Sequence, residues 1–187
     1  LMFSSPKAGY VLFLCHALGA LINGLLYRGR KSVSEISAMP ASAKDDKLLN
    51  NSITSSILSV LIVGGYIAIF SMIIDIAIDI KLVDAIAFLL EKPLSWFSIP
   101  SEVASATVIS MIEITRGCQA FAQSGIDIKI ILPFVAGLLS FGGLSITFQS
   151  LTFLKNCKIK TPYYFLTKLT QAIITFLISL VLVRLFY

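Results

Sequence analysis

Long apolar runs separated by short polar stretches dominate the chain. Five strong runs occupy residues 10–27, 53–80, 103–123, 128–154 and 165–187, and a weaker run occupies 82–97. A helix needs about 20 mostly apolar residues to cross a bilayer. The pattern therefore predicts a single membrane domain over residues 1–187, built as an all-α, polytopic membrane helix bundle. It should have five to six hydrophobic segments, at least one of them broken or re-entrant.

The run over 53–80 is the longest in this part of the chain. At about 1.5 Å per residue it measures about 42 Å, more than the roughly 30 Å hydrocarbon core, so its helix is expected to tilt or protrude. Asp75 and Asp79 would share one face of the protruding end. Gly64 and Gly65, in the middle of the run, indicate a point of close packing or a kink.

The weaker run, 82–97, carries charged residues and Pro93. Two placements remain open for it. It lies at the interface, with Trp96 at the level of the headgroups, or it forms one arm of a re-entrant hairpin. The polar stretch 98–102 then breaks the chain, and Ser101 is expected to cap the next helix.

Two polar stretches, 28–51 and 155–164, are rich in lysine and arginine, so both are expected to face the cytoplasm of a multi-pass protein in the cell membrane. An even number of crossings must separate them, yet three strong runs lie between them. We therefore expect a re-entrant or broken element within 82–123. Cysteines at Ser98 and Ser124 test this, because they would be labelled from opposite sides if the weaker run crossed as a full helix.

The composition agrees with a lipid bilayer as the main partner. Apolar residues make up 57% of the chain and charged residues 13%, against about 45–50% and about 25% in soluble domains. These values exclude a disordered chain, a coiled coil and a nucleic-acid-binding domain, and the net charge of +5 is assigned to the cytoplasmic loops. The three cysteines are far apart in the sequence, so neither a disulfide framework nor a metal site is expected, and no cofactor is expected.

Glu113 and Arg116 stand inside an apolar run, in the sequence IEITRGCQ. An ionisable residue at mid-membrane costs at least about 2.5–3.5 kcal/mol on insertion scales. At this spacing the two side chains can pair on one helix face, and Gln119 and Gln123 would extend the polar face that begins at Glu113. Two interpretations remain open: a functional site facing a cavity, or a structural ion pair at the end of an element, where Gly117 ends the helix.

A second polar motif, LLSFGGLSITFQS, interrupts the run at 128–154. Its adjacent glycines, Gly142 and Gly143, are flanked by hydroxyl and amide side chains. An unwound helix at membrane depth is tolerated where it is buried or lines a cavity, as at the substrate sites of transporters. The alternative is a packing notch for a neighbouring helix, with the hydroxyls bonded back to their own helix.

Two polar residues of the first run have simpler interpretations. His16 is the single histidine of the chain, does not make a metal site alone, and is interpreted as a packed, hydrogen-bonded residue. Asn23 is expected to hydrogen-bond between helices. The sequence holds no P-loop, GxGxxG, HExxH or GxSxG motif, so an enzyme is not expected.

Three segments together resemble a known family: SPKAGYVLFLCHALGALINGLLYR, IEITRGCQ, and SFGGLSITFQ followed by a short lysine-rich loop. They are similar to the C-terminal half of the YlbJ-type sporulation integral membrane proteins. That family belongs to the nucleoside-recognition (Gate) group, which is distantly related to concentrative nucleoside transporters. The resemblance implies that this chain is one half of a protein with two inverted repeats. It also implies pairing with a homologous half or formation of a homo-oligomer.

We therefore expect a transporter or channel-like protein with a polar solute site near mid-membrane, and the resemblance implies a nucleoside-like solute. The candidate substrate-binding residues are Glu113, Thr115, Arg116, Gly117, Ser140, Gly142, Gly143, Ser145, Thr147 and Gln149. The alternative is a non-transporting membrane scaffold needed for spore envelope assembly. A water-accessible cavity that touches both motifs would favour transport, and dry packing around both would favour the scaffold.

Overall fold

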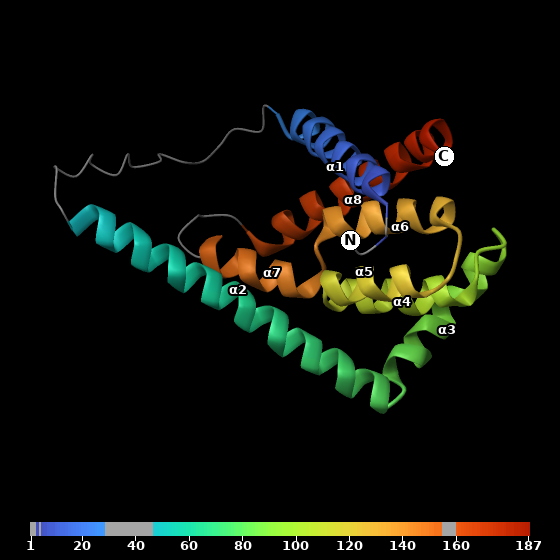
Figure 1. Cartoon of the computed structure of the whole chain (residues 1–187), viewed down its shortest axis with the longest axis horizontal. Helices are drawn as coiled ribbons and strands as arrows, with labels where there is room; N and C mark the ends of the chain where they lie inside the picture. The colour runs from blue at the N-terminus through green and yellow to red at the C-terminus, as the bar shows by residue number, and fades with distance from the viewer. Residues whose placement is uncertain (1–2, 4, 29–46, 155–159) are drawn as a thin grey trace.

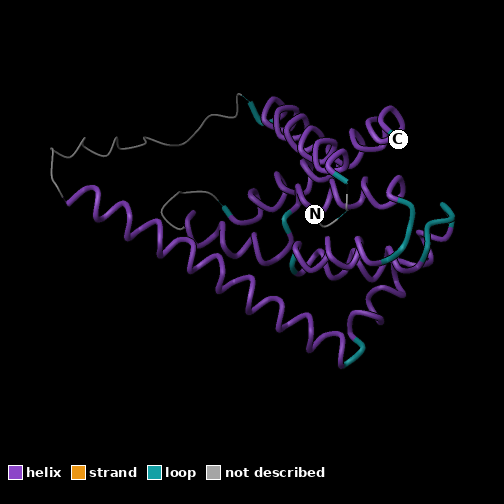
Figure 2. The backbone as a smooth tube through the Cα atoms, in the orientation of Figure 1, coloured by secondary structure: helices purple, strands orange, loops and turns teal. Residues whose placement is uncertain are grey.

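A computed structural model describes residues 3, 5–28, 47–154 and 160–187, and these residues form helices joined by short connections (Figures 1 and 2). In chain order the helices are α1 (Pro6–Leu26), α2 (Lys47–Asp79), α3 (Leu82–Ser95), α4 (Ser101–Ile112), α5 (Ile114–Gln123), α6 (Ile128–Phe141), α7 (Gly143–Leu154) and α8 (Thr161–Phe186). The described part of the chain contains no strand, so the predicted all-α class is confirmed.

Four stretches of the described residues are long and apolar enough to cross a membrane: Pro6–Leu26, Leu49–Asp79, Ile128–Thr152 and Thr161–Phe186. A helix satisfies its own backbone hydrogen bonds, which is why apolar runs of this length fold as helices in lipid. The third stretch combines α6 and α7, which are interrupted at Gly142. The prediction of a helix bundle with a broken segment is therefore confirmed.

The helices α1, α6 and α8 pack closely on one another, and α1 crosses α8 at the top of Figure 1. Gly19 allows the close approach of α1, because a β-carbon there would overlap the Thr175 hydroxyl of α8. Asn23 of α1 joins the same helix pair. Its amide nitrogen donates to the Thr167 carbonyl at 3.2 Å, and its oxygen accepts from the Thr170 hydroxyl at 2.9 Å. The predicted interhelical role of Asn23 is confirmed.

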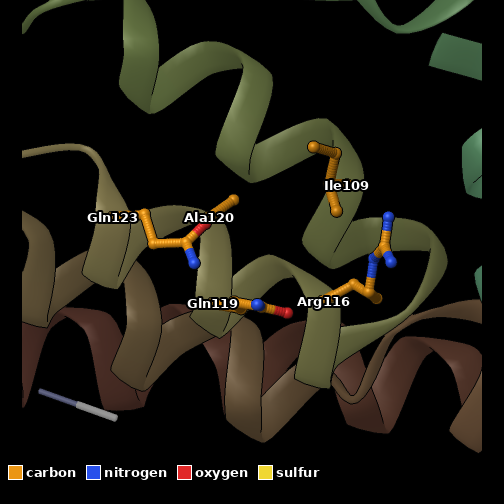
Figure 3. A pocket seen from close by; sticks show the side chains of 5 residues that line it. All are labelled: Ile109, Arg116, Gln119, Ala120 and Gln123. Atoms are coloured by element: carbon orange, nitrogen blue, oxygen red, sulfur yellow. The ribbon is translucent and has the colours of Figure 1, made fainter.

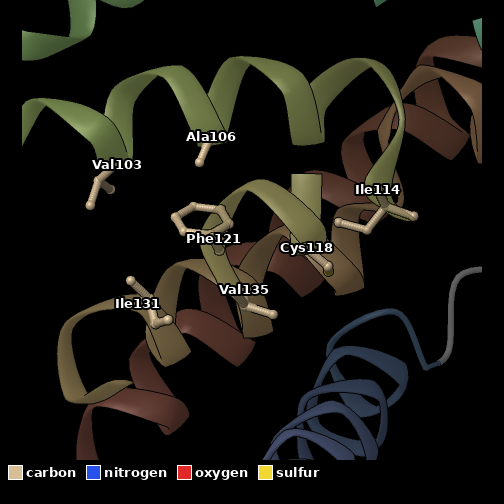
Figure 4. Packing of buried hydrophobic residues seen from close by; sticks show 7 residues of the cluster. All are labelled: Val103, Ala106, Ile114, Cys118, Phe121, Ile131 and Val135. Atoms are coloured by element: carbon tan, nitrogen blue, oxygen red, sulfur yellow. The ribbon is translucent and has the colours of Figure 1, made fainter. Parts of the chain in front are cut away.

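The helices α4 and α5 form a hairpin that turns at Glu113 (Figure 4). This is the broken element that the even number of crossings predicted within 82–123. Side chains of α4, α5 and α6 fill the space between the hairpin and α6 with a buried apolar cluster. Its members are Val103, Ala106, Ile114, Cys118, Phe121, Ile131 and Val135. The cluster fixes the hairpin against α6 and positions its turn.

The long helix α2 forms the outer edge of the molecule and meets α3 at a sharp corner (Figure 1). Lys81, with φ of 61°, makes the left-handed turn between them. A β-carbon at Gly64 or Gly65 would have no neighbour within 4 Å among the described residues, and α2 runs through both without interruption. The expectation of close packing or a kink there is wrong for the described chain. Lipid-facing positions in a single helix need neither.

The weaker run forms α3, which packs on α4 through Val83 and Ala87 and leaves Trp96 at its end exposed. Ser101 is the first residue of α4, and the cap position is held by Pro100, so the predicted Ser101 cap is wrong. Proline fits there because a residue at the start of a helix has no backbone hydrogen bond to lose.

Helices begin inside both basic stretches, so the loops are shorter than the predicted ranges 28–51 and 155–164. Lys47 begins α2 and Thr161 begins α8, so 47–51 and 161–164 belong to these helices, and 29–46 and 155–159 lie outside the described residues. The start of α2, the end of α7 and the start of α8 lie toward the left of Figure 1, whereas the open end of the hairpin lies toward the right.

Ser98 and Ser124 lie at the open end of the hairpin, the first before α4 and the second after α5. Because the hairpin returns the chain to the end where it began, we expect cysteines at both positions to be labelled from the same side of the membrane. A membrane-impermeant thiol reagent applied to intact cells measures this, with Leu61→Cys in the middle of α2 as an unlabelled control. Labelling from opposite sides would contradict the hairpin.

Candidate functional site

Glu113 makes the turn of the hairpin and is 1% exposed. Its backbone is extended, with φ of −142° and ψ of 119°, so α4 ends at this residue and α5 begins after it. The carboxylate caps α5. One oxygen accepts from the Thr115 backbone N–H at 3.0 Å and the other from the Arg116 backbone N–H at 2.7 Å. These two bonds, together with the positive end of the helix dipole, stabilise a carboxylate in a buried position.

The arms of the hairpin approach each other closely at Ser110 and Gly117. A β-carbon at Gly117 would overlap the hydroxyl and the Cα of Ser110. The Ser110 hydroxyl donates back to the Ala106 carbonyl at 2.7 Å, so it is held within its own helix. Gly117 lies within α5 and does not end it, contrary to one of the two interpretations. Because it has no side chain, the two arms can meet.

The turn of the hairpin meets the break between α6 and α7. Gly142 and Gly143 both adopt left-handed conformations, with φ of 87° and 68°. A β-carbon at Gly143 would lie 2.7 Å from the Ser110 carbonyl oxygen and 3.2 Å from that of Met111. The C-terminal carbonyls of α4 thus face the first residue of α7. Two of the predicted motifs, far apart in sequence, are brought together at the middle of the molecule (Figure 1).

Four helix ends meet at this contact: the C-termini of α4 and α6 and the N-termini of α5 and α7. Helix C-termini carry partial negative charge and N-termini partial positive charge, from backbone groups that the helix itself does not bond. The contact of α4 carbonyls with the start of α7 therefore pairs opposite helix ends. Such an arrangement can hold a polar or charged group without a dedicated charged side chain.

Three buried polar side chains of α7 are bonded within their own helix. The Thr147 hydroxyl donates to the Gly143 carbonyl at 2.8 Å, and the Gln149 amide donates to the Ser145 hydroxyl at 3.1 Å. All three side chains are buried. These bonds agree with hydroxyls bonded back to the helix, which was one of the two interpretations of this motif.

Ser140 belongs to a different contact from the hairpin. Its hydroxyl donates to the Thr175 hydroxyl of α8 at 3.0 Å and lies 2.9 Å from the His16 Nδ1 of α1. This polar chain joins α1, α6 and α8 through the fully buried Ser140 and Thr175. The predicted hydrogen bond of His16 is confirmed, but the residue is exposed rather than packed.

Arg116 does not pair with the Glu113 side chain as expected. Its guanidinium bonds the carboxylate of Asp75, which reaches it from α2. The expected pair is wrong because Glu113 turns inward to cap the helix, whereas Arg116 lies one turn of α5 away on the outer face. Thr115, which stands between Glu113 and Arg116, contributes its backbone N–H to that cap and has an exposed side chain.

A concavity of about 190 Å³ lies along the outer face of the hairpin (Figure 3). It is lined by Ile109 of α4 and by Arg116, Gln119, Ala120 and Gln123 of α5. Gln119 and Gln123 therefore extend a polar face that begins at Arg116, not at Glu113. The expected face was assigned to the wrong charged residue, because Glu113 precedes α5 and does not follow its helical period.

Sequence reasoning missed two residues of this region. Ser110 and Thr175 each face a glycine of a neighbouring helix, Gly117 and Gly19 respectively. Ser110 and Gly117 stand on either side of Glu113 in the sequence, and this pair of small residues could have indicated close hairpin arms. Thr175 carries no comparable signal, because its partner lies on the first helix of the chain.

The chain is 25% identical over 193 residues to the sporulation integral membrane protein YlbJ of Bacillus subtilis (strain 168). The alignment covers 91% of this chain and 47% of that protein. The resemblance to YlbJ-type proteins is confirmed. Together with the four candidate spans, it identifies an integral membrane protein. The chain spans about half the length of the curated relative it matches. No family model and no solved structure matches it.

Proposed function

We propose that this chain forms part of a transporter or channel-like protein that moves a small polar solute across the membrane near mid-depth. The observation that carries the proposal is the contact between the hairpin turn and the broken helix, where four helix ends meet. Breaks of this kind disrupt backbone hydrogen bonds in the apolar middle of a span, and transporters use such breaks to contact solutes.

Glu113 and the glycine break are the proposed gate of this pathway. Both carboxylate oxygens already accept backbone hydrogen bonds, but each has lone-pair capacity left for a solute or a proton. Because Glu113 is buried, a solute reaches it only when the turn separates from Gly143. The resemblance to YlbJ-type proteins supports a nucleoside-like solute of the Gate type, and the absence of catalytic motifs favours transport over an enzymatic reaction.

The proposed topology places the stretches 28–51 and 155–164 in the cytoplasm of a multi-pass protein. With α2 and the α6–α7 pair as crossings and the hairpin returning to its own side, two crossings separate the basic stretches, as the positive-inside rule requires. The matching half would come from a homologous segment or a second copy. The half-length match to YlbJ supports this part of the proposal.

A scaffold role in spore envelope assembly is the second candidate, and one observation favours it. Glu113, Ser140 and Ser145 are all buried and bonded to the chain itself. The concavity touches Arg116 but neither Glu113 nor the glycines. Buried polar side chains that bond only to the chain itself would stabilise the helix bundle without any passage of solute.

We expect Glu113→Gln to reduce solute flux at least about tenfold. Both carboxylate oxygens accept backbone hydrogen bonds, so the glutamine NH2 group would face a backbone N–H donor at the gate and one bond would be lost. The measurement is uptake of labelled uridine and of labelled gluconate into proteoliposomes that contain the whole chain. Asp127→Asn is the matched control, since Asp127 caps α6 through the Lys129 backbone N–H but lies outside the gate.

The gate would be contradicted, and the scaffold favoured, if Glu113→Gln lowered the melting temperature but left solute flux unchanged. Loss of flux in Asp127→Asn as well would show that replacing a capping carboxylate by an amide anywhere abolishes transport, and this also contradicts a special role of Glu113.

A further inference from the structure

The outer face of α5 carries a polar stripe that the gate does not use. Arg116, Gln119 and Gln123 follow one another at helical spacing along the concavity, and Figure 3 shows them on α5 beneath Ile109 of α4. The opposite face of α5, which includes Cys118, is buried against α6. The hairpin is therefore apolar toward the core and polar toward the concavity.

Hydrocarbon cannot occupy this concavity at low free energy. The Arg116 side chain is 37% exposed and its partner Asp75 is 57% exposed, and the amides of Gln119 and Gln123 are exposed beside them. Polar groups at membrane depth face water or another polar surface, because lipid offers them no hydrogen bonds. A concave polar surface at this place is therefore expected to hold water.

The lining offers more hydrogen-bond donors than acceptors. A guanidinium has about five N–H donors and no acceptor, and each glutamine amide has about two donors and one acceptor oxygen. The contact to Asp75 uses the Nη2 of Arg116, which leaves further donors of the guanidinium for another group. A donor-rich surface with one cation selects a solute that presents acceptor oxygens, and a planar carboxylate matches the guanidinium best.

Charge balance also favours a monoanion. Asp75 contributes one negative charge to Arg116 and is the more exposed partner of the pair. A solute carboxylate that replaces it at the guanidinium adds one negative charge to this region, whereas a dianionic phosphate would add two at membrane depth. The exchange would also break the ion pair between Asp75 of α2 and the hairpin, while the buried Ala77 of α2 stays packed against α4.

We propose that the concavity is a water-filled binding site in which Arg116, Gln119 and Gln123 hold the carboxylate of a small solute in place of Asp75. This inference deepens the proposed function and rests on it for the position of the hairpin within the membrane. It assigns the solute an acidic group, which the resemblance to nucleoside-recognition proteins does not.

Thiol labelling of the whole chain in lipid nanodiscs tests the water. Ala120→Cys places a thiol among the three polar side chains without removing any of them, in a background where Cys157 is replaced by serine. We expect a water-soluble maleimide to react with it at least about tenfold faster than with Leu61→Cys on the apolar surface of α2, because only hydrated thiols ionise. Equal rates at the two positions would overturn the water-filled site.

Protection of the same thiol tests the ligand. Acetate is expected to slow labelling of Ala120→Cys at least about twofold relative to chloride at equal ionic strength, and Arg116→Gln should abolish this protection. Asp75→Asn should lower the acetate concentration needed for half-maximal protection, because it removes the carboxylate that competes for Arg116. Asp79→Asn, one turn further along α2, is the matched control and should leave the required concentration unchanged.

Two results would overturn the assignment of the ligand. Protection by uridine without protection by acetate would replace the carboxylate with a nucleoside-like solute, and protection by neither would remove the binding site. Because the labelling reports occupancy without transport, acetate protection with no flux of any solute would contradict the proposed function alone. The reverse result, flux without protection, would contradict this inference alone.

Discussion

Replacing Gly117 by alanine is expected to disrupt the hairpin and to lower the free energy of unfolding by more than about 3 kcal/mol. Inserting a methyl group into a packed core usually costs about 1–3 kcal/mol, since neighbouring side chains can move. Here the added β-carbon overlaps the Cα of Ser110 as well as its hydroxyl. A backbone atom cannot move aside without separating the arms. The melting temperature of the purified chain in nanodiscs measures the effect.

Gly24→Ala is the control for this substitution. Gly24 is helical and has open space at its β-carbon position, so alanine there should leave stability unchanged or raise it by up to about 1 kcal/mol. Adding Ser110→Gly to Gly117→Ala removes the hydroxyl but leaves the α4 backbone in the way of the new methyl group, and should restore only part of the loss. A stable Gly117→Ala protein would contradict the close approach of the two arms.

Gly143→Ala is expected to have the second large effect, by separating the hairpin turn from the broken helix. Its φ of 68° costs an L-residue about 1–2 kcal/mol, and the new methyl group would press on the carbonyls that end α4. Both stability and solute flux should fall. The measurements are the melting temperature and the proteoliposome uptake used for Glu113→Gln.

Gly125→Ala separates the two causes. Gly125 has a similar φ of 71° but open space at its β-carbon position, so its replacement measures the backbone strain alone. The loss in Gly143→Ala should exceed the loss in Gly125→Ala, and flux should fall only in the former. Equal losses of stability would mean that the contact with α4 contributes nothing.

The long apolar runs predicted most of the helices, because hydrophobic length decides what can cross a bilayer. The paired glycines located the break between α6 and α7, whereas Glu113 was assigned to a continuous helix face and its turn was not predicted. The need for an even number of crossings placed a broken element within 82–123, which contains the hairpin. Gly64 and Gly65 were misjudged because a glycine pair in lipid is a packing site only if another helix reaches it.

The partners of the site residues were predicted less well. The i, i+3 spacing of Glu113 and Arg116 allowed a pair, but a carboxylate at the start of a helix competes for the backbone N–H groups beside it, and that local contact formed. The Arg116 guanidinium instead forms an ion pair with Asp75 on α2. Spacing within one segment reports which contacts are possible, and it carries no information about a partner from another helix.

The sequence by itself determined the solvent, the helical class and the glycine break, because transfer of side chains into lipid and backbone hydrogen bonding act locally along the chain. Only the tertiary structure decided that the turn at Glu113 meets Gly143, that Gly117 faces Ser110, and that the polar stripe of α5 begins at Arg116. These contacts join residues of different helices. Their formation depends on how side chains of several helices fill one space, a property of the packed bundle that no single segment contains.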